Sequence, residues 1–205
     1  MFRHRNEYPV ESRLPGFEGA TAWLNGEPVT PAALRGHVVL VCFGTYTCIN
    51  WIHALPFIRA WADAYAGRGL KVVGVQTPEF AFESDLDNVK RALAEMDVRY
   101  PVAVDNDYAV WQAFTNHYWP ALYIADADGR IRHHHFGEGG YDESEMVIQM
   151  LLRDAGGDVD LPRCASSPTG SRRRRTGPTS ARRRPTLATT ARQASPPRVA
   201  SPRMR

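Results

Sequence analysis

One cysteine in this chain has the sequence context of a reactive thiol. Cys48 follows an apolar run, Val38–Phe43, and a short Gly/Thr turn, at the point where the next helix should begin. The run has the length and composition of a fully buried strand. A cysteine at a helix N-terminus has backbone N–H groups and a partial positive charge near its sulfur, which favours the nucleophilic thiolate. We therefore expect Cys48 to be a nucleophile, with an inert buried thiol as the alternative.

The elements that must position Cys48 are indicated by hydrophobic periodicity and by turn residues. Strands are expected at Ala22–Leu24, Val38–Phe43, Leu70–Val75, Pro101–Val104, Leu122–Ala125 and Ile131–Phe136. Helices are expected after Thr30-Pro31, at about Ile49–Tyr65, after a cap at Ser84, at Asp107–Phe114 and from Asp142 onward. Strands that alternate with helices and end in a hairpin and a last helix predict an α/β fold. Its mixed central β-sheet would be covered by helices on both faces.

Charge is divided unevenly along the chain. The 205 residues carry a formal net charge of +3, but residues 161–205 contain 12 of the 25 Lys and Arg residues and no acidic residue. We therefore expect the function to lie in the acidic part that precedes them. We expect three parts, which are an extended lead-in at residues 1–13, a folded domain at residues 14–158 and a disordered tail at residues 159–205.

The tail is rich in Arg, Pro, Ser and Thr. Its arginine runs at 172–175 and 182–184 would suit a nucleic-acid-binding arm. We hypothesise instead that the tail is a frameshift product, because the chain has 23 Arg and 2 Lys, as GC-rich codons would give. Nucleic-acid binding is kept only as a third hypothesis for the function.

The sequence indicates neither export nor membrane insertion. No apolar run reaches the roughly 18 residues of a spanning helix, and the N-terminus has no apolar core of a signal peptide. The three cysteines, Cys42, Cys48 and Cys164, do not form a disulfide framework. We therefore expect a cytoplasmic protein with no membrane partner.

Several long segments occur together in one order within the acidic part. They are TYTCINW, HALPFIRAW, TPEFAFE, DNVKRAL, VAVDNDYAVWQAF, YWPALYIAD and IRHHHFGEG. Over roughly residues 14–156 the chain resembles the TlpA/DipZ-type thioredoxin-like domains of bacteria, in the redoxin (AhpC-TSA) superfamily. The resemblance implies a thioredoxin-like fold and thiol-based redox chemistry without a cofactor, with Cys48 as the attacking thiol. It also implies that Trp119-Pro120 is a cis peptide bond beside Cys48 and that both residues contact the substrate.

Three positions depart from the family pattern. Trp51 stands where the second cysteine of C-x-x-C would be, Cys42 replaces a buried Asp, and Gly44 replaces an aromatic residue that is usually Trp. Without a partner at position 51, Cys48 has three routes. It could form a sulfenic acid that an external thiol resolves, form mixed disulfides with partner proteins, or use Cys42. We expect Cys42 to be a small core residue beneath Cys48.

Other side chains near Cys48 are candidates for supporting roles. Thr45 stands three residues before it, as in peroxiredoxins, but their motif also needs a proline at the position of Val41. An ordinary turn residue is the alternative for Thr45. Thr47, directly before Cys48, is counted as a supporting residue. Glu79, after the second buried strand, is interpreted either as a proton acceptor or as an exposed loop carboxylate.

The histidine tract and the helical aromatic residues have simpler interpretations. His133–His135 would alternate between the faces of a strand, and no second cluster shows ligand spacing, so no metal is expected. Trp61, Trp111 and Tyr108 lie on expected helices and are interpreted as core residues.

The sequence therefore predicts a thiol-dependent oxidoreductase with Cys48 as its one nucleophile. Its substrate would be a peroxide or a protein disulfide, and its reductant an external thiol. Trp51, Trp119 and Pro120 are expected to shape the surface around the sulfur. The alternative is a non-catalytic thioredoxin-like module that binds extended peptides beside Trp119-Pro120, which the changes at positions 42 and 44 favour.

Overall fold

A seven-stranded mixed β-sheet forms the centre of the fold. The structure, a computed structural model, describes residues 8–156 and Cys164. The strand order is β1-β7-β6-β3-β4-β5-β2. The strands are β1 (Ser12–Arg13), β2 (Ala22–Leu24), β3 (Val38–Gly44), β4 (Leu70–Gln76), β5 (Val102–Val104), β6 (Ala121–Ala125) and β7 (Arg130–Phe136). The predicted tail, apart from Cys164, lies outside the described residues, as does the lead-in up to residue 7.

The strand directions follow from how the strands are connected. β3 runs parallel to β4 and β4 parallel to β5, whereas β6 pairs antiparallel with β3 and with β7. A tight turn joins β6 to β7, and Gly129 in this turn has a φ of 72°, a conformation that glycine adopts without strain. The parallel core with an antiparallel hairpin confirms the predicted α/β fold class.

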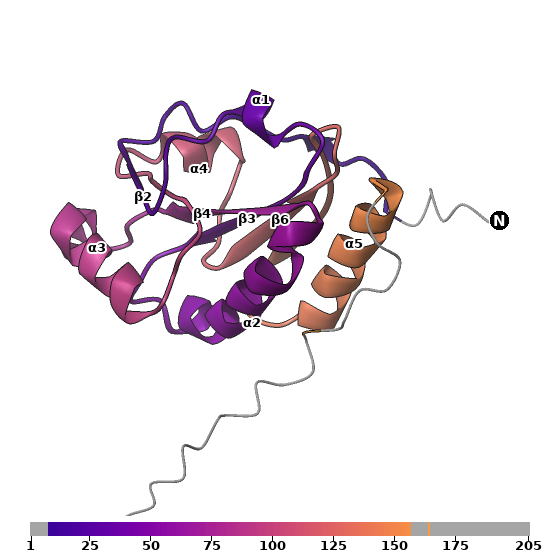
Figure 1. Cartoon of the computed structure of the whole chain (residues 1–205). Coiled ribbons are helices and arrows are strands. Elements are labelled where there is room, and N and C mark those ends of the chain that lie inside the picture. The colour runs from indigo at the N-terminus through magenta and orange to yellow at the C-terminus, as the bar shows by residue number, and fades with distance from the viewer. Residues whose placement is uncertain (1–7, 157–163, 165–205) are drawn as a thin grey trace, which may run out of the picture. The chain divides into compact units, whose positions relative to one another are not determined.

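Helices cover both faces of this sheet. They are α1 (Pro31–Leu34), α2 (Ile49–Tyr65), α3 (Leu86–Glu95), α4 (Ala109–Ala113) and α5 (Tyr141–Asp154). In Figure 1, α2 and α5 lie on one side of the sheet, and α1 and α4 lie on the other. The buried apolar side chains form two clusters that match these two sides of the sheet. One cluster contains residues of α2, α3 and α5, and the other contains residues of α1 and α4.

The central strand β3 belongs to both clusters. All seven of its residues are buried. Leu40 and Cys42 pack in the cluster of α2, whereas Val41 and Phe43 pack in the cluster of α4. A strand that is buried on both faces needs a continuous apolar run, which explains why this segment shows no apolar–polar alternation.

The start of α3 differs by one residue from the expectation. Its N-cap is Asp85 rather than Ser84, because an Asp85 carboxylate oxygen accepts from the N–H groups of Asp87 and Asn88 at 3.0 and 2.9 Å. Serine and aspartate are both favoured at N-caps, so two adjacent candidates cannot be ranked from sequence alone.

A buried carboxylate fixes the short helix α4. Asp105 accepts hydrogen bonds from the N–H groups of Val110 and Trp111, both at 2.9 Å, and from the Thr77 hydroxyl at 3.0 Å. Burial raises the pKa of Asp105 above its ordinary value, although these hydrogen bonds act in the opposite direction. A helix of five residues has little stability of its own, so Asp105 determines where Trp111 lies.

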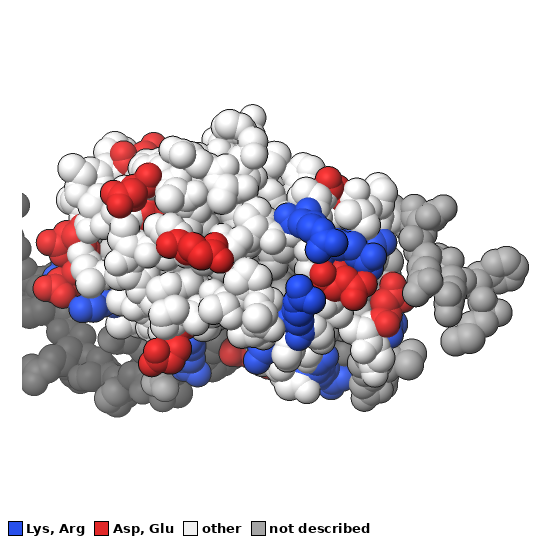
Figure 2. Space-filling view, turned by 90° about the horizontal axis from the view of Figure 1, so that it is seen from above, with Lys and Arg blue, Asp and Glu red and all other residues white. Residues whose placement is uncertain are grey.

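The surface over α1 and α4 has no dominant charge. Figure 2 shows acidic and basic side chains scattered over this face, with a larger group of both signs on the right and uncharged surface between. Within the part of the chain that the structure describes, no helix is both long enough and apolar enough to cross a bilayer.

We predict that Asp105→Ala lowers the free energy of unfolding by about 2 kcal/mol, because three buried donors lose their acceptor. Urea unfolding followed by tryptophan fluorescence measures the change. Asp107→Ala, at an exposed position two residues further on, is the matched control and should change it by less than about 0.5 kcal/mol. Equal effects of the two substitutions would contradict the role of Asp105.

Candidate active site

Cys48 is the N-cap residue of α2, four residues after the end of β3. Its carbonyl accepts from the N–H of Ile52 at 2.9 Å, and its own N–H donates to the carbonyl of Thr45 at 3.0 Å. The side chain is half-buried, and its sulfur lies 3.9 Å from the carbonyl oxygen of Trp119, within reach of a weak S–H hydrogen bond. The structure thus places a free, partly accessible sulfur at the N-cap of α2, where it accepts no hydrogen bond from the N–H groups of the first turn.

The segment Trp119-Pro120 lies against this sulfur. Its peptide bond is cis, as the family resemblance implied. Pro120 is buried, whereas Trp119 is half-buried and donates from Nε1 to the carbonyl of Thr77 at 3.1 Å. The rings of Trp119 and Trp111 have centroids 4.2 Å apart. Trp111 therefore packs against the ring of the residue whose carbonyl lies beside the Cys48 sulfur.

The three aromatic residues that were predicted to be core differ in their burial. Trp61 is fully buried, which confirms the prediction for that residue. Tyr108 and Trp111 are only half-buried, and their ring centroids lie 5.9 Å apart. The hydroxyl of Tyr108 donates to the carbonyl of Pro78. These two residues support the loop after β4 and the ring of Trp119, which their helical positions did not reveal.

Trp51 occupies the position of the absent second cysteine. Only 4% of its side chain is exposed, so the prediction that it shapes the surface is wrong. Its indole fills the space in front of Gly44, where a Cβ would come within 2.1 Å of the ring. The two departures from the family pattern at Gly44 and Trp51 therefore depend on each other, because the large ring of Trp51 leaves no room for a side chain at position 44.

Cys42 is a core residue, as predicted. It is 1% exposed, and burial raises the pKa of its thiol to about 12, with a hydrogen bond to Trp51 acting in the opposite direction. A thiol with so high a pKa supplies almost no thiolate near neutral pH. In this conformation Cys42 is therefore not a second nucleophile for Cys48.

A buried carboxylate that the sequence analysis missed organises the loop beside Cys48. Glu83 is fully buried and accepts from the Thr47 hydroxyl and from the N–H groups of Glu79 and Phe80, the last two at 2.6 and 2.9 Å. These bonds join the residue before Cys48 to the loop that follows β4. We refer to this arrangement as the Glu83 clamp.

Glu79, the carboxylate singled out from the sequence, is exposed, and only its main chain takes part in the Glu83 clamp. A sequence signal for Glu83 does exist. It stands three residues after Phe80, the N-cap of a short 3₁₀ turn, where Glu often accepts from the cap N–H. Burial acts to raise the pKa of Glu83, but hydrogen bonds, above all that from Thr47, outweigh it and hold the pKa below its ordinary value.

Thr45 is fully buried in the turn before Cys48. Its hydroxyl accepts from Nε2 of Gln76 at 2.9 Å, and a hydrogen bond from Thr45 also helps to lower the pKa of Glu83. Thr45 is therefore a structural residue of the turn, as in the second of the two interpretations that its sequence position allowed.

The histidines of β7 are strand residues whose side chains alternate between the two faces. His134 lies on one face, with Nδ1 2.6 Å from a carboxylate oxygen of Glu11, and His133 lies on the other, edge-on to the ring of Tyr8. Burial lowers the pKa of His133. Among the residues that the structure describes, no three His, Cys, Asp or Glu side chains are grouped as metal ligands would be.

The strand order, the cysteine at the start of α2 and the cis proline beside it define a thioredoxin-like protein. The fold is similar to the solution structure of a thioredoxin-like protein in its oxidised form, with a TM-score of 0.64 and 34% sequence identity. The match covers 70% of this chain and 96% of that protein. The predicted thioredoxin-like fold is confirmed.

The chain belongs to the AhpC/TSA family, whose profile matches residues 10–134. It is 45% identical over 158 residues to the protein DipZ of Mycobacterium tuberculosis, a match that covers 76% of this chain and 23% of DipZ. It is 32% identical over 141 residues to the thiol-disulfide oxidoreductase YkuV of Bacillus subtilis, covering 69% of this chain and 95% of YkuV. The predicted resemblance to DipZ-type redoxin domains is confirmed, and the chain spans less than a quarter of the length of DipZ.

We predict that Gly44→Ala lowers the free energy of unfolding by about 1–3 kcal/mol, because the added methyl group collides with the buried indole of Trp51. The matched control is Gly67→Ala, where a Cβ would meet no atom within 4 Å. Urea unfolding measures both variants. In a Trp51→Ala background the cost of Gly44→Ala should shrink, and an unchanged cost would show that Trp51 is not the obstacle.

We predict that Glu83 stabilises the fold at neutral pH and that this contribution is lost as the pH falls below 4.5, the ordinary pKa. Because the pKa of Glu83 is lowered in the folded state, the unfolded chain takes up the proton first as the pH falls. Urea unfolding between about pH 7 and about pH 3 should therefore show a smaller loss of stability for Glu83→Gln than for the unmodified chain. Glu79→Gln is the matched control, and parallel curves for the unmodified chain and Glu83→Gln would contradict the prediction.

Proposed function

We propose that this chain carries out thiol–disulfide exchange through a single nucleophile, Cys48. The observation that carries the proposal is the place of this cysteine, half-buried at the N-terminus of α2 and 3.9 Å from the carbonyl of Trp119. The similarity to YkuV, which is named a thiol-disulfide oxidoreductase, supports this reaction class. Cys42 is buried and Trp51 fills the second motif position, so the second thiol would come from another molecule.

The reaction would begin with attack of the Cys48 thiolate on one sulfur of a partner disulfide. An S–S bond forms between Cys48 and the partner, the partner's own S–S bond breaks, and its second sulfur leaves as a thiolate. An external thiolate then attacks the Cys48 sulfur and releases the partner's first sulfur. A second external thiolate frees Cys48 and forms the disulfide of the reductant, so the partner gains the two electrons that two external thiols lose.

The neighbouring residues would hold Cys48 and the substrate in place. The Glu83 clamp and the bond between Gln76 and Thr45 fix the turn that carries the sulfur. Trp119 and Pro120 would contact the substrate, because the carbonyl of Trp119 lies 3.9 Å from the sulfur.

Reduction of a peroxide is the second candidate, which membership of the AhpC/TSA family favours. The Cys48 thiolate would attack the O–O bond and become a sulfenic acid, with the other oxygen leaving as water or an alcohol. One external thiol would then form a mixed disulfide with loss of water, and a second would release Cys48. Burial of Thr45 against Gln76 argues for the disulfide substrate, because the threonine hydroxyl is already engaged within the protein.

We predict that Cys48 reacts with the aromatic disulfide DTNB at least about tenfold faster than free cysteine at neutral pH, because its partly exposed sulfur lies at the N-terminus of α2. Cys48→Ser should abolish this fast reaction, and mass spectrometry should locate the mixed disulfide at Cys48 in the unmodified chain. Cys42→Ala is the control variant and should leave the rate within about twofold, because the Cys42 thiol is buried.

The same variants are then reacted with hydrogen peroxide. A fast reaction of Cys48 with peroxide and a slow one with DTNB would assign the peroxide as substrate. Rates with both reagents no faster than those of free cysteine would leave the non-catalytic peptide-binding module as the function.

A further inference from the structure

Two exposed phenylalanines form a stacked pair in the loop that the Glu83 clamp holds. The side chains of Phe80 and Phe82 are 51% and 53% exposed, their ring centroids are 5.7 Å apart and their planes differ by 3°. A loop that only joins β4 to α3 has no need of two such rings in water, because removing their exposed apolar surface from water would be favourable. Neighbouring exposed apolar side chains of this kind are typical of interaction surfaces.

Hydrogen bonds hold this pair at both ends. The N–H of Phe80 donates to the carboxylate of Glu83 at 2.9 Å. The carbonyl of Phe82 accepts from the Tyr46 hydroxyl at 3.2 Å and from Nδ2 of Asn88 at 3.1 Å. Because the main chain that carries the rings is already ordered, little conformational entropy would be lost when a partner binds to them.

The same contacts fix the pair relative to the nucleophile. Glu83 also accepts from Thr47, the residue directly before Cys48. The ring of Tyr46, one residue earlier, lies with its centroid 6.4 Å from that of Phe82. The aromatic pair and the reactive sulfur are therefore carried by two loops that share one buried carboxylate.

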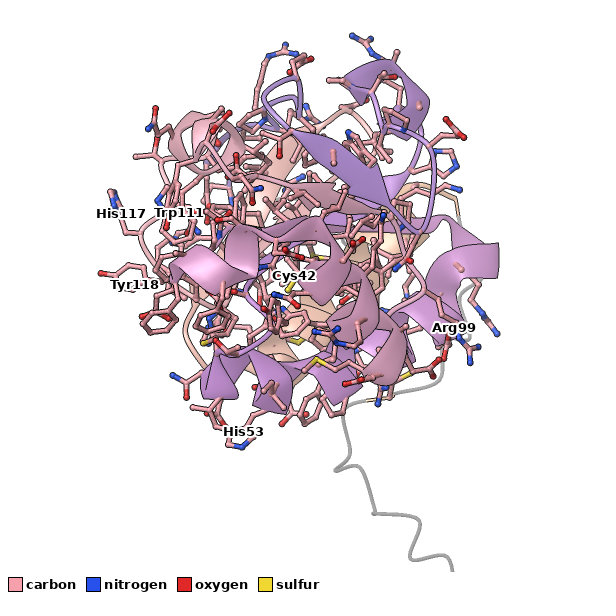
Figure 3. All side chains as sticks on the ribbon, turned by 90° about the vertical axis from the view of Figure 1, so that its left-hand side faces the viewer. Cys42, His53, Arg99, Trp111, His117 and Tyr118 are labelled. Carbon is pink, nitrogen blue, oxygen red and sulfur yellow. The ribbon has the colours of Figure 1, made fainter. Side chains whose placement is uncertain are left out.

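Exposed apolar side chains also occur next to the other groups of the site. Ile49, which follows Cys48, is 59% exposed. Tyr118, which precedes Trp119, is 52% exposed, and its ring centroid lies 5.0 Å from that of Phe136. In Figure 3, Tyr118 projects from the surface, whereas Cys42 lies inside the molecule. The residues that follow Cys48 and precede Trp119 in sequence thus add exposed apolar side chains to those of Phe80 and Phe82.

Two pockets of the described structure lie away from Cys48. A pocket of about 450 Å³ is lined by residues of α1, α2, β4 and the segment 99–101, and one of about 290 Å³ lies beside it. Neither is lined by Cys48. Neither pocket therefore gives a small molecule an enclosed site next to the Cys48 sulfur. A polypeptide, in contrast, could cover the exposed rings.

We propose that Phe80 and Phe82 form a docking surface that selects protein disulfides with an aromatic or large aliphatic side chain close to the reactive cysteine. The proposal rests on the thiol–disulfide exchange proposed for Cys48, which determines the occupant, because the partner's sulfur must reach Cys48. An aromatic side chain of the partner would stack on the exposed rings and remove apolar surface from water. The recognition is apolar and therefore changes little with salt.

The test compares two synthetic peptides that contain one intramolecular disulfide and differ only in Phe or Ser two residues from a cysteine. The full chain and Phe80→Ala/Phe82→Ala are reacted with each peptide and with DTNB. The unmodified chain should prefer the Phe peptide, and the double variant should reduce this preference by about tenfold, the loss expected when aromatic anchors are truncated. Met146→Ala, at a 48% exposed position on α5, is the matched control and should keep the preference.

Two kinetic results would overturn the proposal. One is an unmodified chain that reacts equally with both peptides. The other is equal slowing of both peptides and of DTNB in the double variant, which would mean that the rings only support the loop. If sedimentation shows self-association that the double variant abolishes, the surface binds a second copy of the chain and the proposal is overturned as well.

A binding measurement separates this proposal from the proposed reaction. Calorimetry measures the affinity of Cys48→Ser for the Phe peptide with its cysteines replaced by serine, where no exchange takes place. Introducing Phe80→Ala/Phe82→Ala into this variant should weaken binding about tenfold. Tight binding together with an unreactive Cys48 in the unmodified chain would contradict the proposed exchange but not the docking surface. Binding that Phe80→Ala/Phe82→Ala leaves unaltered would contradict the docking surface alone.

Discussion

The burial of β3 on both faces is the constraint on which the rest of the structure depends. Because all seven residues of this strand are out of water, helices must cover both sides of the sheet at its centre. The chain leaves the core at the carboxyl end of β3, and Cys48 lies on the turn that follows. The carboxyl ends of the central strands are where α/β folds usually carry their reactive groups. One buried strand therefore determines the layers and the place of Cys48.

The parts of the fold that follow local periodicity could be predicted from the sequence. The helix expected at Ile49–Tyr65 has those bounds in the structure, and β3 is one residue longer than the apolar run that predicted it. Contacts between distant segments could not be predicted. Thr47 and Glu83 are separated by 36 positions, and the position of Glu83 three residues after Phe80 does not indicate that its side chain also accepts from Thr47. Only the path of the chain decides which carboxylate is buried beside the active-site turn and which one points into solvent.

Trp51 shows the same limit within the site itself. On its helix it stands three residues after Cys48, a position for which the sequence predicts a surface role. The space that receives its indole is left by Gly44, which belongs to a different element. Each of these residues appears in the sequence as a separate departure from the family pattern. Only the packing shows that they compensate for one another.

This compensation restricts how a two-cysteine site could arise in this chain. Trp51→Cys alone would empty a space that a buried indole fills, and replacing a large core side chain by a small one costs about 3–5 kcal/mol. Gly44→Trp alone would drive a second ring into the first, because even a Cβ at position 44 comes within 2.1 Å of it. Either change is harmful without the other. The effects of the two substitutions on the free energy of unfolding should therefore be strongly non-additive. A chain that acquires the two changes one at a time would pass through a single variant of lower stability.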